Sequence, residues 1–239
     1  MTRNLLSSGV IAGAATALVV AILQLWLIQP LIVEAEMFET GIKVLATSVT
    51  AATEMASNHE ATESSGGIDV TRASFTVLFL IVTWSGFGLL AVSGIAVLRH
   101  VLPSLAVSAP AIALVGFATF SLMPALGLPP ELPGMPAADL ATRQIWWVAT
   151  ALATFAAVVA ALRFWSYVAW LGAVALVAGP HLIGAPMPPI APATVPPDLA
   201  ALYTARVLGV SFLGWMLCGS ILMLLSGRED TSQVWQQPR

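Results

Sequence analysis

The sequence predicts an all-α protein whose helices cross a membrane several times. Of its 239 residues, 58% are hydrophobic and only 9% are charged, whereas an ordinary soluble domain carries about a quarter charged residues. The hydrophobic residues gather in runs that approach the roughly 20 helical residues needed to cross the hydrocarbon core of a bilayer. Proline-rich segments separate several of these runs. We therefore expect residues 1–239 to form a single integral membrane domain embedded in the lipid bilayer.

About six apolar runs are the predicted transmembrane helices. The fourth and fifth runs are separated only by Arg163, so an architecture with five spans and one re-entrant or interfacial segment stays open. The first run is longer than the apolar core of a signal peptide, typically 7 to 15 residues, and is interpreted as a span. The six runs cover residues 5–29, 74–98, 105–126, 145–162, 164–183 and 204–226.

Six spans would place both chain termini on the same side of the membrane. The basic residues divide five against four between the two sides, and the positive-inside rule then favours cytoplasmic termini with a cytoplasmic tail at 227–239. The five on the predicted cytoplasmic side are Arg3, Arg99, Arg163, Arg228 and Arg239; the four on the outer side are Lys43, Arg72, Arg143 and Arg206.

Three loops are expected on the outer side. Residues 40–72 form a polar loop, whereas "MPALGLPPELPGMPAADLATR" and "GPHLIGAPMPPIAPATVPPDLAALYTAR" are apolar and proline-rich. Proline cannot continue a helix, and an apolar loop avoids water by packing on protein. We expect these two loops to fold against each other over the bundle. Their matched patterns also suggest that 105–162 and 164–226 are duplicated helical hairpins.

Two residue patterns concern packing inside the membrane. Small residues recur every fourth position in the first span and predict close approach of a neighbouring helix; they are Gly9, Gly13, Ala17 and Ala21. Four tryptophans gather near the expected ends of the fourth and fifth spans, as in the aromatic belt at a membrane interface; they are Trp146, Trp147, Trp165 and Trp170.

Composition and motifs exclude several classes of function. The net charge is −3 with only nine basic residues, which argues against a nucleic-acid partner. No P-loop, dinucleotide glycine pattern, HExxH, CxxC or Gly-x-Ser-x-Gly motif occurs, so we expect neither an enzyme nor a tightly bound cofactor. The single cysteine, Cys218, lies in an apolar run and is interpreted as a small buried residue.

The candidate functional residues are polar groups near the outer ends of the spans. Glu34 and Glu36 follow the first span, and Glu36 would line the outer mouth if the helix continued past Pro30; the alternative is a helix end that meets water. His181 lies beside Pro180, with Met187 six residues further on. Imidazole binds borderline metals such as Co(II), and thioether sulfur binds softer ions. His181 is thus either a metal ligand or a hydrogen-bonded structural histidine.

Four stretches of the sequence resemble the CbtA family of predicted bacterial cobalt transporter subunits. They are "LIQPLIVEAEMFE", "LMPALGLPPELPGM", "ATRQIWW" and "PHLIGAPMPP". The resemblance implies a multi-pass protein of the cytoplasmic membrane that takes up Co(II) for cobalamin synthesis. It also implies a small single-span partner, CbtB, which carries a histidine-rich metal motif.

The resemblance also marks positions of interest for the metal. They are Glu34, Glu36, Pro130, Glu131, Arg143, His181 and Met187. The family is usually described with about five spans. This chain has no histidine cluster of its own, so the site of metal capture is expected in the partner.

Two functional hypotheses follow. A metal-ion permease predicts polar residues along a continuous interior path, whereas a non-transporting scaffold or accessory subunit predicts a dry bundle. The sequence favours a dry bundle, because the spans offer mainly Ser, Thr and Trp as polar groups. The ion, the energy source and the oligomeric state do not follow from the sequence.

Overall fold

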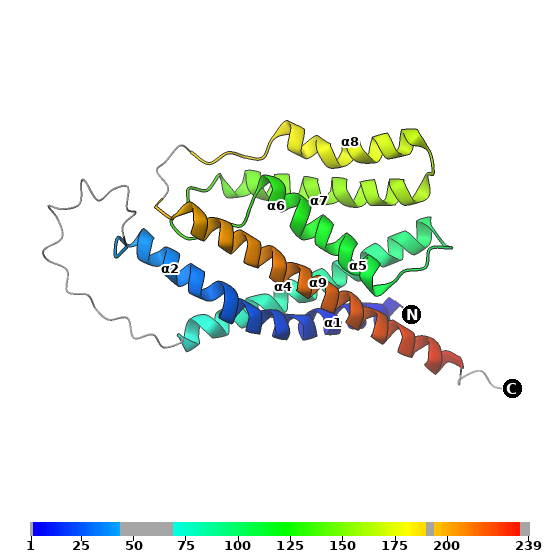
Figure 1. The fold of residues 1–239 in the computed structure, drawn as a ribbon. Helices are drawn as coiled ribbons and strands as arrows, with labels where there is room; N and C mark the ends of the chain where they lie inside the picture. Colours follow the sequence, from blue (N-terminus) through cyan, green and yellow to red (C-terminus); the bar gives the residue numbers. More distant parts are fainter. Residues whose placement is uncertain (1, 44–68, 190–193, 235–239) are drawn as a thin grey trace, which may run out of the picture.

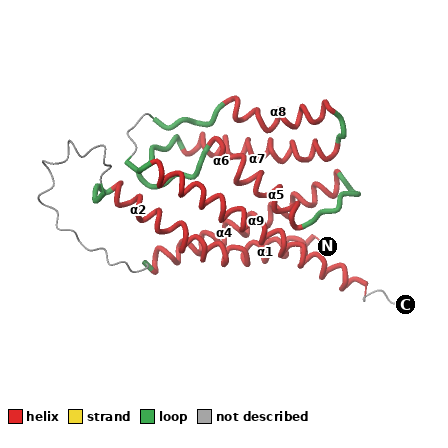
Figure 2. The backbone as a smooth tube through the Cα atoms, in the orientation of Figure 1, coloured by secondary structure: helices red, strands yellow, loops and turns green. Residues whose placement is uncertain are grey.

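The computed structural model describes residues 2–43, 69–189 and 194–234, and every regular element in these ranges is a helix (Figures 1 and 2). The predicted all-α fold is therefore confirmed. The elements are α1 (Thr2–Leu23), the π-helix η1 (Gln24–Ile28), α2 (Gln29–Glu39), α4 (Val70–Val101), α5 (Ala109–Phe117), the π-helix η3 (Ala118–Leu122), α6 (Met123–Gly127), α7 (Leu140–Arg163), α8 (Tyr167–Ile183) and α9 (Pro197–Val234).

Five helical segments are long and apolar enough to cross a membrane. They are Leu6–Glu39, Val70–Val101, Ala109–Gly127, Leu140–Arg163 and Pro197–Leu225. The remaining apolar helix, α8, has 17 residues and so rises only about 25 Å, less than the roughly 30 Å of hydrocarbon. By length and composition, five helices thus qualify as spans; α8 is shorter but carries the chain back along α7, and this return passage lets the start of α1 and the end of α9 share one end. Figure 1 shows α8 running back alongside α7.

The bundle has two distinct ends. The N-terminus, the α4–α5 connection and the α7–α8 turn lie together at what we call the terminal end (right in Figure 1). At the opposite, proline-rich end, α2 and α8 finish while α4, α7 and α9 begin. The start of α1 and the end of α9 lie at the same end, as the sequence predicted for the two ends of the chain. The side of the membrane that each end faces remains a prediction.

The first span is longer than the sequence predicted. We expected it to stop at residue 29, before Pro30, but the helical chain continues to Glu39. The π-turn η1 immediately precedes α2, whose first turn contains Pro30. The same sequence of π-turn and proline recurs at η3 and Pro124. Proline leaves the carbonyl four residues earlier without its usual donor, and a wider local turn accommodates this loss without ending the helix.

The expected boundaries at the two polar segments agree only in part. The polar loop predicted at 40–72 matches the gap between Glu39, which ends α2, and Val70, which begins α4; residues 44–68 lie outside the described ranges. The predicted tail at 227–239 stays a prediction: α9 continues to Val234, but its apolar span ends at Leu225. The proposed duplication of 105–162 and 164–226 stays a prediction.

Glycine brings α1 and α4 into direct backbone contact. A Cβ atom added to Gly88 would overlap the carbonyl oxygen of Gly9, and one added to Gly13 would overlap the backbone of Trp84. Close approach between helices in lipid depends on such small residues, because it maximises van der Waals contact where no hydrophobic driving force exists. The predicted small-residue face of the first span is therefore an interhelical contact with α4.

The centre of the bundle is filled by aromatic rings. Trp215 of α9 is fully buried and packs on the rings of Trp84, Phe87 and Phe120, with centroid separations of 5.8, 5.4 and 5.6 Å. Its indole Nε1 donates a hydrogen bond of 3.3 Å to the hydroxyl of Ser121. The ring lies against Gly116, where an added Cβ would overlap it. The middle of the bundle is thus packed and apolar.

The two proline-rich loops meet over the proline-rich end, as the sequence predicted. Leu132 of one loop and Val195 of the other are buried in one cluster with Leu31 and Ala35 of α2 and Leu199 of α9. The hydroxyl of Thr194 donates a hydrogen bond of 2.8 Å to the carbonyl of Gly134, which joins the loops directly. Leu132 and Val195 are therefore buried against α2, α9 and each other.

The glycine contact between α1 and α4 gives a stability prediction. Gly88→Ala should lower the free energy of unfolding by about 1–3 kcal/mol, because the new methyl group must displace backbone atoms of α1. Thermal unfolding in detergent measures the change. Gly86→Ala on the same helix is the control, since no atom lies within 4 Å of its added Cβ. Equal stability of the two variants would contradict the close contact.

Candidate functional site

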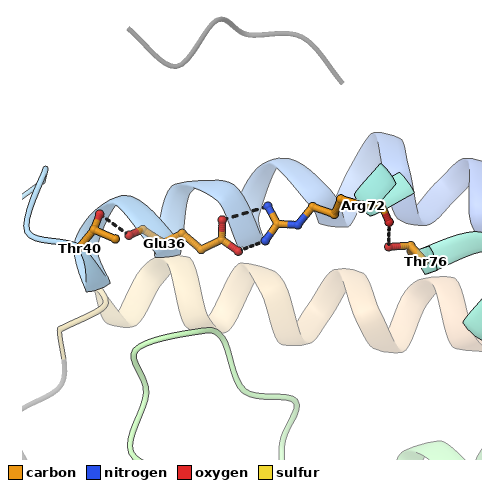
Figure 3. A network of polar contacts seen from close by, with 4 residues as sticks. All are labelled: Glu36, Thr40, Arg72 and Thr76. Carbon is orange, nitrogen blue, oxygen red and sulfur yellow. Dashed lines mark hydrogen bonds and ion pairs between the residues drawn. The ribbon is translucent and has the colours of Figure 1, made fainter. Parts of the chain in front are cut away.

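Glu36 and Arg72 form an ion pair at the proline-rich end. Figure 3 shows the two side chains pointing toward each other from α2 and the first turn of α4. Both terminal nitrogens of the Arg72 guanidinium group, Nη1 and Nη2, donate hydrogen bonds to the carboxylate, and the distance from Nη1 to Oε2 is 3.0 Å. The paired side chains are 41% and 31% exposed. Asp69 caps α4 and accepts hydrogen bonds from the backbone amides of Thr71 and Arg72, which helps to orient this turn.

The other two acidic candidates are also paired with basic side chains. Lys43 Nζ lies 2.9 Å from Glu34 Oε1, and Arg143 Nη2 lies 2.8 Å from Glu131 Oε2. The carboxylates that we expected to attract a cation are therefore already compensated by cations of the chain. The pair of Arg143 and Glu131 connects the start of α7 to the first proline-rich loop.

His181 lies in the last turn of α8 and contacts Trp146 of α7. The two rings meet edge to face, with centroids 5.5 Å apart. The indole Nε1 of Trp146 donates a hydrogen bond of 3.2 Å to the carbonyl of Pro180, which fixes the end of α8 against α7. The imidazole Nε2 of His181 is buried and has no hydrogen-bond partner among the described residues. This nitrogen is thus held inside the protein by packing alone.

The predicted metal-site residues do not converge into one cluster. Met187 is 84% exposed in the loop after α8, while Nε2 of His181 is buried. Glu34, Glu36 and Glu131 belong to three separate ion pairs. In the described ranges, no group of three or more His, Cys, Asp or Glu residues is arranged to hold a metal ion. Any metal site that includes His181 must take further ligands from elsewhere.

The structure assigns roles that the sequence did not predict for Trp146 and Arg206. We interpreted Trp146 as an anchor in an aromatic belt, but it is 8% exposed and packs between α7 and α8. Arg206 of α9 donates a hydrogen bond of 2.6 Å to the carbonyl of Leu27 in η1. The sequence signal for this hydrogen bond was Pro30, because a proline in a helix leaves carbonyls of the preceding turn free to accept hydrogen bonds from other side chains.

The ion pair at the proline-rich end gives a second prediction. Glu36→Gln and Arg72→Gln should each reduce the free energy of unfolding by less than about 1 kcal/mol, because the pair is partly exposed and screened by solvent. The double variant should lose no more free energy of unfolding than the less stable of the two single variants. A cycle of thermal unfolding measurements at low and high salt tests this. A coupling energy of several kcal/mol would show that the pair is a buried structural element instead.

Comparison with known proteins gives one match. The family model described as "Probable cobalt transporter subunit (CbtA)" matches residues 2–226. No match was found among curated proteins or among solved structures. The matched region includes all five membrane-spanning segments, both proline-rich loops and the residues discussed above. The chain therefore belongs to the CbtA family, which is described as a family of probable cobalt transporter subunits.

Proposed function

We propose that this protein is the multi-span subunit of a transporter that takes up Co(II) across the bacterial cytoplasmic membrane, together with a small single-span CbtB-like partner. Membership of the CbtA family supports cobalt as the transported ion and supports the role of this chain as a transporter subunit. The five apolar spans support a membrane location. The terminal end faces the cytoplasm in this proposal; labelling of a cysteine at exposed Pro188 from the cytoplasmic side alone would overturn that orientation.

The observation that carries the proposal is the unsatisfied nitrogen of His181. A buried polar atom without a hydrogen bond costs about 1–3 kcal/mol, and such an atom calls for a water, an ion or a missing partner. Imidazole nitrogen is a common ligand for divalent cobalt and similar metals. His181 also lies at the proline-rich end, where an ion from the outer side would first meet the protein.

The remaining ligands come from the partner in this proposal. The described residues contain no metal-binding cluster, and His181 alone gives one ligand. His59, Glu60 and Glu63 are further metal-binding residue types in the sequence, but they lie outside the described ranges. Glu34, Glu36 and Glu131 act as auxiliary oxygen ligands only after the metal displaces their basic partners. The expected role of this chain is to receive the ion from a partner that captures it.

The scaffold hypothesis has one observation in its favour. Trp215 and its aromatic neighbours fill the centre of the bundle, so the described helices do not enclose a polar route from end to end. A non-transporting subunit needs no such route. A transporting subunit with a packed centre must instead move the ion along its surface, at a contact with another chain. The two hypotheses differ in whether residues of this chain affect the specificity of uptake.

The uptake proposal predicts the effect of substitutions at His181. Cells that produce this chain with its partner should accumulate cobalt in preference to nickel and zinc. His181→Ala should reduce cobalt accumulation at least about tenfold at limiting metal, because it removes a direct ligand. His181→Gln should not restore it. Accumulation of the three metals is measured side by side, with the amount of the protein in the membrane determined in each strain.

His100→Ala is the matched control, since His100 is exposed at the terminal end of α4. It should accumulate cobalt as the unmodified chain does. Normal accumulation in His181→Asn would identify His181 as a structural histidine and contradict its role as a ligand. Unchanged accumulation in cells that lack this chain but retain the partner would favour the scaffold hypothesis.

A further inference from the structure

A cavity of about 470 Å³ opens between α4, α5 and α7 in the half of the bundle nearest the terminal end. Its walls come from the second half of α4, the α4–α5 connection, α5 and the second half of α7, with Trp215 contributing from α9. The lining is aliphatic and aromatic except for Ser93 and Thr119. The cavity is therefore an apolar site at membrane depth, distinct from the proline-rich end where His181 lies.

The cavity arises because α7 does not pack along α4 and α5. Its main contacts are with α8 over most of its length and with η3 and α6 near the proline-rich end. The ring of Phe155 on α7 approaches α4 near Gly94, 3.5 Å from the position that an added Cβ would take. Toward the terminal end the space between these helices is open, and in a bilayer an apolar molecule must fill it.

Basic residues flank the terminal rim of the cavity. Arg99 and His100 follow Leu98, and Arg163 follows Leu162; both leucines line the cavity. All three basic side chains are exposed, and none has an ion-pair partner among the described residues. The guanidinium carbon of Arg163 lies 5.2 Å from the centroid of the Phe164 ring. Every carboxylate side chain that the structure describes lies at the opposite end of the bundle.

The cavity, about 470 Å³, is large enough to hold one lipid chain. If a methylene group occupies roughly 30 Å³, as a water molecule does in the liquid, the same space accommodates on the order of 15 methylene groups.

We propose that this cavity binds one acyl chain of an anionic phospholipid, whose phosphate lies between Arg99 and Arg163 at the terminal rim. The apolar walls accept the chain, and the two guanidinium groups compensate the negative headgroup. Basic sites between transmembrane helices commonly select anionic lipids in this way. The bound lipid fills the space between α4, α5 and α7 and so connects the α7–α8 hairpin to the rest of the bundle.

Native mass spectrometry of the full chain in detergent tests the proposal, with palmitoyl-oleoyl phosphatidylglycerol and phosphatidylcholine as the two added lipids. The unmodified chain should bind one phosphatidylglycerol at least about tenfold more tightly than phosphatidylcholine. Arg99→Gln combined with Arg163→Gln should abolish this preference. Equal binding of both lipids by the unmodified chain would overturn the proposal.

Gly94→Leu should weaken phosphatidylglycerol binding at least about tenfold, because the added side chain enters the cavity. Gly86→Leu is the matched control: it lies on the same helix in open space outside the cavity, and it should bind lipid normally. If Gly94→Leu does not fold, Ala111→Leu on α5 tests the same wall. Unchanged binding in the cavity variant, or equal loss in the control, would contradict the site.

A small diazirine amino acid in place of Leu162, which lines the cavity and already carries a large side chain, distinguishes the occupant in native membranes. The proposal predicts a crosslink to phospholipid, detected as a lipid-sized increase in mass. A crosslink to a second protein chain instead would overturn it.

Discussion

The packing of Trp215 at the centre of the bundle is the constraint on which the rest of the structure depends. The indole is fully buried, and its faces are covered by aromatic rings from α4 and η3. Gly116 must be glycine to leave room for it, while Ser121 accepts its only polar hydrogen. Helices α4, α5 and α9 are therefore held at distances that one large side chain determines, and the cluster around this side chain is apolar.

The apolar centre of the bundle separates two groups of charged side chains, one at each end of the bundle. At the proline-rich end, ion pairs connect α2 to α4 and join the first proline-rich loop to the start of α7, and the two loops cover the helices. At the terminal end, Arg99 and Arg163 lie beside an apolar cavity and have no ion-pair partner among the described residues. Metal handling is proposed at the first end and lipid binding at the second, and the packed aromatic cluster lies between them.

The sequence predicted the all-α fold, the sharing of one end by both termini and the meeting of the proline-rich loops, because hydrophobicity and proline act locally. It placed the end of the first span at residue 29, since nothing local shows that η1 accommodates Pro30 or that Arg206, far along the chain, binds the Leu27 carbonyl. It named Glu36 and Glu131 but not all their partners: Arg72 reaches Glu36 only through tertiary packing. The burial of His181 Nε2 likewise depends on Trp146, 35 positions away in the chain.

The central claim is that this chain contributes a ligand to cobalt transport but does not form the ion path by itself. Cobalt entry into liposomes that contain a cobalt-sensitive fluorescent dye tests this most directly. Liposomes with the purified chain alone should show no entry above that of protein-free liposomes, whereas liposomes with both the chain and its single-span partner should show entry that His181→Ala abolishes. Cobalt entry through the chain alone would contradict the account, because a bundle centred on Trp215 provides no polar route.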